Sequence, residues 1–365
     1  MPANRDELGV AVAGLGYWGP NLMRNFATST KWHVEWIVDL DERRRSRMQR
    51  LYPTRRATAD FDEVLGDPAV DVVAIATPPA LHYDMALRAI AAGKHVLVEK
   101  PLAEEAGQAR ELVQAAQQRG VRLFTDHTFL YAGAVEAMRR AFVGGDLGEI
   151  YYAESSRVNL GLFQQTNVIW DLAPHDVSIL NHIFGELPEA IACSANAYIH
   201  PPVWDVAFLL MRYGSGRLAH VHLSWLSPVK VRRMMLSASN RMAVWDDVDP
   251  SEKLRIYDKG VVRNPTSETL PQQMVSYRLG DVRIPMVDGR EPLAKLVDDV
   301  YSGVREGAPT RIGERIGYDV VRCIEAACES VARGGATVAH ERRAIAVTSP
   351  ALGTNDASGA RSPSA

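Results

Sequence analysis

Three glycines near the amino end of the chain are spaced to hold a dinucleotide. Gly14, Gly16 and Gly19 form the pattern GxGxxG, which follows an apolar run typical of a buried strand and begins a run with helical periodicity. In that setting the first glycine permits a tight turn, the second lets the backbone approach a pyrophosphate, and the third lets the helix pack against the strand. Tyr17 and Trp18 lie in the same loop, and the amino terminus of the helix offers free N–H groups to phosphate oxygens. The alternative interpretation is a glycine-rich turn that binds nothing.

A carboxylate stands where the adenine ribose of such a dinucleotide would lie. Asp39 ends the next expected strand, 20 positions after Gly19, which is the spacing of an acidic residue that accepts the ribose hydroxyls. Its charge would repel a 2′-phosphate and therefore favours NAD over NADP. Arg43, Arg44 and Arg45 follow closely and are the residues that could bind such a phosphate instead. We interpret them as an exposed helix face and expect NAD as the cofactor.

A histidine and an aspartate lie about one helical turn apart in the second half of the chain. Asp171 and His175 are four positions apart, which puts both side chains on one face of a helix. Pro174 is tolerated only in the first turn of that helix, so we expect the helix to run from about residue 172 to residue 184. Asp171 is then either its N-cap or a ligand of a substrate, and the spacing alone favours neither. For His175 the alternative to a catalytic role is a buried, hydrogen-bonded core histidine.

The elements that would position these residues alternate in the first third of the chain. Strand-like apolar runs and amphipathic helical runs follow one another, which predicts an α/β Rossmann domain with a doubly wound parallel sheet. The expected strands are 9–13, 34–38, 70–76 and 95–98, with helices at 21–29, 81–92 and 103–119 and a last strand just before His127.

Strands at hairpin spacing dominate after residue 132. They predict an α+β domain with an open, mainly antiparallel sheet, a helix at 133–143 and two closing helices at 292–306 and 315–333. The expected strands are 149–158, 191–198, 207–213, 217–225, 231–239 and 242–246. The predicted boundaries are 1–128 for a dinucleotide-binding domain, 129–347 for a substrate-binding and oligomerisation domain, and 348–365 for a disordered tail.

Composition and charge exclude several classes of protein. The chain has 365 residues and a formal net charge of -3, so nucleic acid is not expected as a partner. No apolar run approaches the about 20 residues of a membrane helix, and the amino end lacks the apolar segment of a secretory signal. Cys193, Cys323 and Cys328 show no metal-ligand or redox spacing. We therefore expect no metal site, no membrane contact, and free thiols in a reducing cytoplasm.

Further motifs give the chain a family resemblance. The pattern TPxxxH, made by Thr77, Pro78 and His82, follows the expected strand 70–76, and an EKP motif follows the expected strand 95–98 within AAGKHVLVEKPLA. With GxGxxG before them and DxxxH after, these motifs resemble the Gfo/Idh/MocA oxidoreductases over residues 10–333. The phrases GYWGPN, DHTFLY, WDLAPHD and SWLSPVKVRR resemble one subgroup, which includes nucleotide-sugar 3-dehydrogenases and dehydrogenases of aminoglycoside and deoxysugar biosynthesis.

The resemblance implies roles for the EKP motif. In the family its lysine, here Lys100, lies beside the nicotinamide and the substrate hydroxyl, and the peptide bond before the proline, here Pro101, is often cis. For His82 the alternative to a cofactor contact is local packing. The cofactor contacts implied in this part of the chain are Thr77, Pro78, His82, Glu99 and Lys100.

The protons released in the reaction indicate which residues act on the substrate. Oxidation of a carbinol sends a hydride to the nicotinamide and releases the hydroxyl proton. A histidine, with an ordinary pKa of about 6.5, can accept that proton near neutral pH, whereas a lysine stays charged unless strongly desolvated. We therefore expect His175 as general base, Lys100 as the cation that stabilises the developing alkoxide, and Asp171 as substrate ligand. Further expected substrate contacts are His127, Tyr131, Arg157 and Asn159, while Lys230, Arg232 and Arg233 either bind a diphosphate or support the sheet surface.

These assignments predict an NAD-dependent sugar dehydrogenase. The expected reaction oxidises a secondary hydroxyl, at C3, of an aminoglycoside or a nucleotide-linked sugar to a ketone, or reduces that ketone. Alternatives are an NAD-dependent glycosidase that oxidises its substrate transiently, an inositol dehydrogenase, and a cofactor-sensing subunit without activity. We also expect a homo-oligomer, dimer or tetramer, joined through the exposed face of the second sheet. The apolar residues expected in those strands are Trp204, Phe208, Leu210 and Leu223.

Overall fold

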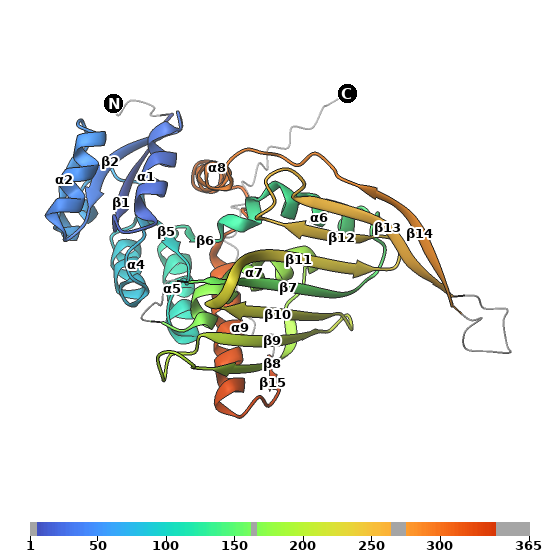
Figure 1. Cartoon of the computed structure of the whole chain (residues 1–365). Helices are drawn as coiled ribbons and strands as arrows, with labels where there is room; N and C mark the ends of the chain where they lie inside the picture. Colours follow the sequence, from blue (N-terminus) through green and yellow to red (C-terminus); the bar gives the residue numbers. More distant parts are fainter. Residues whose placement is uncertain (1–5, 162–165, 264–274, 341–365) are drawn as a thin grey trace, which may run out of the picture.

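Two sheets form the framework of the molecule (Figure 1). The computed structural model describes residues 6–161, 166–263 and 275–340. The first sheet has six parallel strands in the order β3-β2-β1-β4-β5-β6, which confirms the doubly wound parallel sheet expected from the sequence. Its strands are β1 (Leu8–Ala13), β2 (Trp32–Val38), β3 (Arg56–Thr58), β4 (Val72–Ile75), β5 (His95–Glu99) and β6 (Leu123–Asp126).

The central strands of this sheet are buried on both faces. Every residue of β1 and of β4 is buried, as expected where helices cover a parallel sheet on both sides. The strand order reverses between β1 and β4, and ligands of such sheets bind in the crevice outside the carboxyl ends at that point. The connecting helices are α1 (Gly19–Thr28), α2 (Glu42–Leu51), α3 (Phe61–Leu65), η1 (Pro79–Leu81), α4 (His82–Ala91), α5 (Ala106–Arg119) and η2 (Thr128–Tyr131).

The second sheet is large and mainly antiparallel. It has nine strands in the order β14-β13-β12-β11-β7-β10-β9-β8-β15, and β10 with β7 is the parallel pair among antiparallel neighbours. The predicted class of the second half is therefore also confirmed. The strands are β7 (Ile150–Leu160), β8 (Pro188–Asn196), β9 (Val206–Tyr213), β10 (Leu218–Ser224), β11 (Leu226–Ala238), β12 (Met242–Asp246), β13 (Leu254–Arg263), β14 (Val275–Arg283) and β15 (Val338–Ala339).

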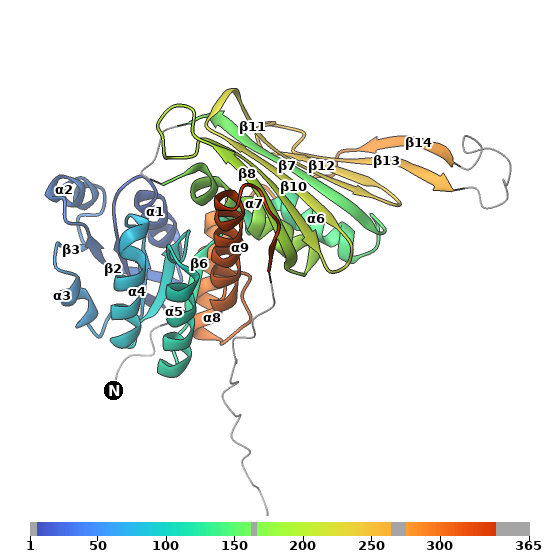
Figure 2. The ribbon, with the colours of Figure 1, turned by 90° about the horizontal axis from the view of Figure 1, so that it is seen from below.

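Among the described residues, helices pack on one face of this second sheet (Figure 2). These helices are α6 (Gly133–Val143), α7 (Val168–Phe184) and α9 (Glu314–Ala332). α9 also contacts β6 of the first sheet and the neighbouring helix α5, so it packs against both halves of the molecule.

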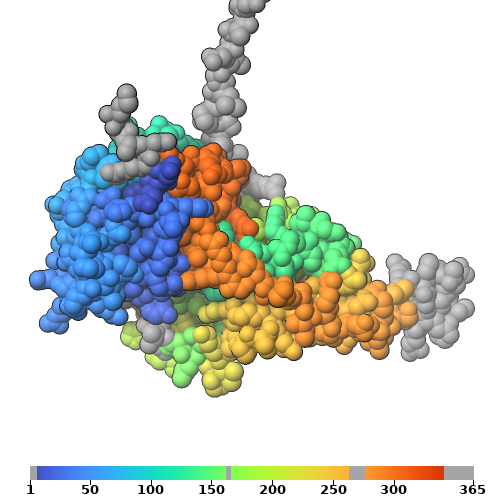
Figure 3. All heavy atoms as spheres, turned by 90° about the horizontal axis from the view of Figure 1, so that it is seen from above, coloured from blue at the N-terminus to red at the C-terminus, as the bar shows by residue number. Residues whose placement is uncertain are grey.

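The last long helices return the chain to the first sheet. α8 (Pro292–Arg305) packs on α1, and Figure 3 shows this orange segment lying against the blue amino-terminal part. Trp32 Nε1 donates to the carbonyl oxygen of Val297 at 3.1 Å, and the Tyr301 hydroxyl donates to that of Asp6 at 2.7 Å. The sequence alone does not indicate which half each closing helix contacts.

The helix that carries Asp171 begins earlier than the sequence predicts. α7 begins at Val168, and the Asn167 side chain caps it by accepting from the backbone N–H groups of the second and third helical residues. Pro174 therefore lies inside the helix, and the expected start near residue 172 is wrong. An internal proline costs about 3 kcal/mol, which is offset here because most of α7, from Val168 onward, is buried. The alternative role of Asp171 as N-cap is excluded.

Other differences from the predicted elements lie at the edges of the sheets. The sequence patterns do not identify the hairpin of β13 and β14 or the short strands β3 and β15. The apolar residues Tyr277, Leu279 and Val282 of β14 are exposed, so this strand does not bury an apolar face as the other predicted strands do. The tail expected to be disordered, 348–365, lies outside the described residues.

Three further features of the described residues concern membrane helices, cysteines and metal ligands. None of the described helices combines the length and apolarity needed to span a bilayer. Cys193, Cys323 and Cys328 are free thiols. No group of three or more potential metal ligands occurs within residues 6–161, 166–263 and 275–340.

Candidate active site

The glycine loop between β1 and α1 is crowded at two glycines and open at the third. Gly14 has a φ of +90°, and a Cβ there would lie 2.6 Å from backbone atoms of Ala76. A Cβ on Gly19 would lie 1.8 Å from the carbonyl oxygen of Gly14. A Cβ on Gly16 would meet only Arg44 Nη1, 4.0 Å away. The fold therefore requires the first and last glycine, while the space beside Gly16 fits a pyrophosphate held close to the backbone.

The start of α1 supports the same interpretation of the loop. Its N-cap residue, Trp18, makes no side-chain cap hydrogen bond, and Pro20 occupies the first turn. The Tyr17 side chain is 91% exposed, so it does not pack over the loop and leaves the loop accessible. An uncapped helix amino terminus with N–H groups and a positive dipole end is a site for phosphate oxygens.

Asp39 lies at the end of β2, beside the glycine loop. Its carboxylate accepts from the backbone N–H of Leu15 and of Asp41, at 2.7 and 2.8 Å. Arg44 Nη1 lies 3.7 Å from the same carboxylate, while Arg45 donates to the carbonyl oxygen of Asp39 at 2.6 Å. Asp39 therefore fixes the loop as well as presenting a negative charge, and Arg44 is a cation beside that charge.

Lys100 and Asp171 join the two halves of the molecule. Lys100 follows β5 and its peptide bond to Pro101 is cis. Its Nζ donates to the backbone carbonyl oxygen of Asp171 at 2.8 Å and lies 3.5 Å from the Asp171 carboxylate. Trp225 Nε1 donates to the other carboxylate oxygen at 3.1 Å. The carboxyl edge of the first sheet thus meets α7 and β10–β11 of the second half at one point.

Two histidines near this point have ring nitrogens with no partner among the described residues. These are Nδ1 of His175 and both ring nitrogens of His127, which is 1% exposed. Burial lowers the pKa of His175 well below its ordinary value, and the positive charges of Lys100 and Arg157 lower it further. Burial and the charge of Lys100 lower the pKa of His127 to about 3. Both imidazoles are therefore neutral at pH 7, and buried polar atoms of this kind are expected to meet a ligand or water.

A pair of carboxyl groups lies at the same edge. Glu99 and Asp126 end β5 and β6 and are register partners. Trp18 Nε1 donates to Asp126 at 2.7 Å, and Thr128 Oγ1 also donates to it. Burial raises the pKa of Glu99 well above its ordinary value and, to a lesser extent, that of Asp126. The glycine loop, through Trp18, is thereby tied to the strand ends that carry Lys100.

Two residues expected to contact cofactor or substrate are hydrogen-bonded to other groups of the protein instead. The ring nitrogens of His82 lie 2.7 and 2.9 Å from the carbonyl oxygens of Pro101 and Thr77, so His82 anchors the EKP turn to the TPxxxH loop containing Pro78. The Tyr131 hydroxyl donates to Asp299 of α8. It therefore lies outside the cluster around Lys100.

Arg157 is buried beneath the site rather than exposed on its floor. Its Nε lies 2.7 Å from Oδ2 of Asp176 on α7, with both side chains at most 5% exposed. The Ser155 hydroxyl donates to the same carboxylate at 2.8 Å. This pairing makes Arg157 a link between β7 and α7. Asn159 lies further along β7, and its Oδ1 would be 3.2 Å from a Cβ on Gly161.

Phe129 and Trp225 also belong to the surroundings of His175 and Asp171, although the sequence motifs did not single them out. The Phe129 and His175 rings pack edge to face, with their centres 5.0 Å apart. The guanidinium groups of Arg157 and Arg232 lie 4.6 and 5.0 Å from the centre of the Phe129 ring. Trp225 holds the Asp171 carboxylate. Trp225 and Phe129 lie in the motif phrases SWLSPVKVRR and DHTFLY, which are the signals by which they could have been found.

Arg232, Arg233 and Lys230 take different positions on β11. Arg232 donates to Asp247, with Nη1 and Oδ2 2.6 Å apart, so it is paired. Lys230 and Arg233 are exposed. The alternative of sheet support therefore fits Arg232 better than phosphate binding does.

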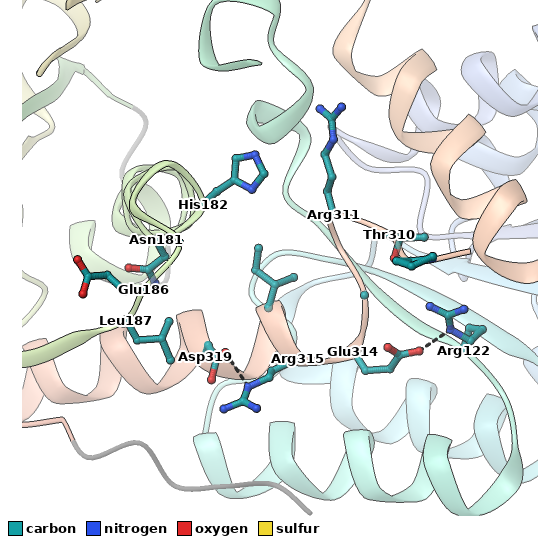
Figure 4. Close-up of a pocket in the computed structure, with 14 residues that line it drawn as sticks. Arg122, Asn181, His182, Glu186, Leu187, Thr310, Arg311, Glu314, Arg315 and Asp319 are labelled. Carbon is teal, nitrogen blue, oxygen red and sulfur yellow. Dashed lines mark hydrogen bonds and ion pairs between the residues drawn. The ribbon is translucent and has the colours of Figure 1, made fainter. Parts of the chain in front are cut away.

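A separate cavity lies away from these residues (Figure 4). It has a volume of about 650 Å³ and lies between the end of α7 and the start of α9. Its charged groups largely pair with one another, since Arg122 bonds Glu314 at 2.6 Å and Arg315 bonds Asp319 at 3.3 Å. It is lined by none of the site residues expected from the sequence.

This edge fits a dinucleotide laid across the first sheet. Asp39 and the glycine loop suit the adenosine and pyrophosphate, because they lie at β2 and β1. The other end of the cofactor would then reach the ends of β4, β5 and β6, where Lys100, Glu99 and the neutral histidines lie. The arrangement offers a cation, a carboxylate and a proton acceptor next to the expected position of a nicotinamide.

Two family models match parts of the chain. Residues 8–127 match the family model described as "Oxidoreductase family, NAD-binding Rossmann fold", and residues 135–244 match "GFO/IDH/MocA C-terminal domain". A 1,5-anhydro-D-fructose reductase of Ensifer adhaerens is 36% identical over 180 residues, which is 46% of this chain and 54% of that protein.

Two further proteins are similar over most of the chain. The scyllo-inositol 2-dehydrogenase (NADP(+)) IolW of Bacillus subtilis (strain 168) is 24% identical over 79% of this chain and 84% of its own length. The crystal structure of GenD2 from gentamicin A biosynthesis, in complex with NAD, has a TM-score of 0.77 and 24% identity, covering 92% of this chain and 97% of that one. At this identity the structural likeness shows the fold alone.

The role of Asp39 can be tested by removing its charge. We predict that Asp39→Asn weakens NAD binding about ten-fold, because an amide is a poorer acceptor for ribose hydroxyls than a carboxylate, and that it narrows the difference between NAD and NADP. Calorimetric titration with both cofactors measures this.

Arg44→Ala is the matched control, since this variant removes the neighbouring cation and leaves the carboxylate in place. It should retain NAD binding. Equal affinity of the unaltered protein for both cofactors, or preferential NADP binding that Arg44→Ala abolishes, would contradict the assignment.

Proposed function

The chain belongs to the Gfo/Idh/MocA family of NAD-binding oxidoreductases, and we propose that it oxidises a secondary hydroxyl group of a sugar. Its cofactor is NAD. The observation that carries the proposal is the contact of Lys100 with Asp171, next to a neutral His175, at the carboxyl edge of the first sheet. Hydride removal from a carbinol requires these three functions at one place: a proton acceptor, a stabilising cation and a group that orients the hydroxyl.

His175 is the proposed proton acceptor. Its Nδ1 has no partner among the described residues, and its lowered pKa keeps the ring neutral and able to accept a proton at pH 7. When bound, NAD accepts the hydride from the carbinol carbon. The hydroxyl proton then passes to the imidazole, which returns it to solvent because its lowered pKa makes the protonated ring short-lived.

Lys100 and Asp171 are proposed to hold the hydroxyl group that reacts. The ammonium group already bonds the Asp171 carbonyl oxygen, so its position is fixed before a substrate arrives. An alkoxide oxygen that forms beside it is stabilised without further movement of the protein. The Asp171 carboxylate, oriented by Trp225, can accept from a second hydroxyl of the substrate.

We propose a sugar with adjacent hydroxyl groups as substrate, oxidised at C3. The support is the resemblance of the sequence phrases to nucleotide-sugar 3-dehydrogenases and aminoglycoside dehydrogenases, together with similarity to GenD2, whose description names gentamicin A biosynthesis, and to an anhydrofructose reductase. The second candidate is an inositol, favoured by similarity to the scyllo-inositol dehydrogenase IolW.

Free buried thiols fit our expectation of a reducing cytoplasm.

The activity is tested by NADH absorbance against four substrate classes: nucleotide sugars, sugar phosphates, inositols and aminoglycosides. We predict NADH formation with one class, and that Lys100→Ala and His175→Ala each lower single-turnover NADH formation by roughly 10²- to 10⁴-fold. Both variants should still bind NAD, because the affinity resides mainly at the glycine loop and Asp39. The two losses should be less than additive, since both groups serve one proton transfer.

The controls separate the alternatives. Arg232→Lys keeps the positive charge that pairs with Asp247 next to the Phe129 ring, and should retain most turnover. Near-normal turnover of His175→Ala across pH would make His175 a core histidine. Cleavage of a glycoside without net NADH would indicate a glycosidase, and no reaction with any class would contradict the proposed oxidation.

We also propose that the open face of the second sheet joins copies of the chain. On this face Phe208, Leu210 and Leu218 are each more than 40% exposed, and the Phe208 ring stacks on His222 at 4.5 Å. A contiguous apolar patch of this kind favours self-association. Leu223 is buried against the helices, so it does not belong to the patch; Trp204 precedes β9 and packs on the core.

Leu210→Asp tests this surface. We predict that the unaltered protein is a dimer or tetramer at micromolar concentration by light scattering, and that Leu210→Asp shifts it to a smaller species because a charge would be buried without a partner. Val143→Asp is the control, since Val143 is 69% exposed at the end of α6 on the other side of the sheet. A monomer mass for the unaltered protein would refute the interface.

A further inference from the structure

The carboxyl pair of Glu99 and Asp126 has no role in the proton transfer described above. The two residues end neighbouring parallel strands in register, and their carboxyl groups lie close enough together to share a proton. Two ionised carboxylates cannot form a hydrogen bond, because neither has a donor. Two adjacent carboxylates away from water would also repel each other, so binding of one proton stabilises the pair.

The surrounding donors assign the proton to Glu99 and the charge to Asp126. Asp126 accepts from Trp18 Nε1 at 2.7 Å and from the Thr128 hydroxyl, and donors of this kind stabilise the ionised form. Glu99 has one other hydrogen bond, from the backbone N–H of Lys100, and burial raises its pKa well above the ordinary value. Glu99 thus donates to Asp126, and the pair carries a single negative charge.

The pair lies where the cofactor's redox-active end is expected. Asp39 and the glycine loop occupy the β2 and β1 ends of the sheet, and the pair occupies the β5 and β6 ends. His127, directly after Asp126, is 1% exposed with both ring nitrogens unpartnered, which is a second indication that a ligand meets this strand end.

We propose that Glu99 and Asp126 form a one-proton carboxyl pair whose charge, held on Asp126, favours binding of NAD+ over NADH. The inference rests on the proposed function, because it requires a nicotinamide at the Lys100 edge. The oxidised ring is positively charged and the reduced ring is neutral, so a fixed negative charge nearby stabilises the first and has little effect on the second.

The pair also counteracts the positive charge of Lys100. Its ammonium group, needed to stabilise an alkoxide, lies beside the expected nicotinamide and would repel the oxidised ring. Asp126 lies on the strand next to the one that leads into Lys100, so its negative charge offsets that repulsion. Trp18 connects the pair to the glycine loop, and the same loop therefore binds the phosphates and keeps the charge in place.

Two variants separate the charge from the hydrogen bond. In Glu99→Gln the amide N–H replaces the carboxyl donor, so the charge stays on Asp126. In the double variant Glu99→Gln with Asp126→Asn neither residue can ionise, while both shapes are preserved. The two variants therefore differ only in the charge of Asp126. Because residue 99 is glutamine in both, it cannot ionise to replace that charge.

The experiment measures the dissociation constants of NAD+ by calorimetry and of NADH by fluorescence. Opposite charges about 10 Å apart at an effective dielectric of about 20 correspond to roughly ten-fold in affinity. We expect the ratio of the NADH to the NAD+ constant to fall about ten-fold from Glu99→Gln to the double variant, almost entirely through weaker NAD+ binding. Glu99→Gln is the reference for this comparison, because it keeps the charge on Asp126.

Equal losses for both cofactors, or an unchanged ratio in the double variant, would overturn the charge assignment and leave the proposed oxidation standing. Failure of the unaltered protein to bind either cofactor would overturn both. Should the double variant not fold, infrared spectroscopy decides the proton's location: a protonated carboxyl band at neutral pH that disappears in Glu99→Gln supports the inference, and its persistence contradicts it.

Discussion

The hydrogen bond from Lys100 to the carbonyl oxygen of Asp171 is the contact on which the site depends. At 2.8 Å it joins the end of β5, in the first sheet, to a helix of the second half. The cofactor loop lies on one side of this contact and the substrate residues on the other. Because reacting groups must be aligned to within about an ångström, the packing of α8 on α1 and of α9 on α5 matters as much for the chemistry as the residues themselves.

Buried charges around this contact determine the protonation of the histidines. Desolvation and nearby cations together hold the His175 ring neutral, and those cations are themselves neutralised, Arg157 by Asp176 and Arg232 by Asp247. An unpaired buried guanidinium would be strongly destabilising. The paired arginines can therefore pack against the Phe129 ring behind His175 without leaving uncompensated charge in the core.

The sequence predicts the first sheet better than the contacts across the molecule. The order of strands and the glycine loop follow from short-range patterns, because β1, β4 and β5 are apolar runs followed at once by the motif residues. The start of α7 was not predictable in this way, since the burial of Val168 and Ile169 outweighs the local effect of Pro174. For Arg157, the residue type suggested a ligand, whereas its partner Asp176 lies 19 positions away on another element and is identified only by the fold. Phe129 and Trp225 contribute shape and one hydrogen bond, which spacing rules do not detect.

The most direct test of the account is a double-mutant cycle on Lys100 and Asp171, followed by single-turnover NADH formation with the sugar that reacts fastest. Lys100→Met and Asp171→Asn remove the two charges while keeping similar volumes. If these residues act as one unit on the reacting hydroxyl, the double variant will be about as slow as the slower single variant. Losses that multiply in the double variant would show that the two residues act independently, and would contradict a hydride-transfer site built on their contact.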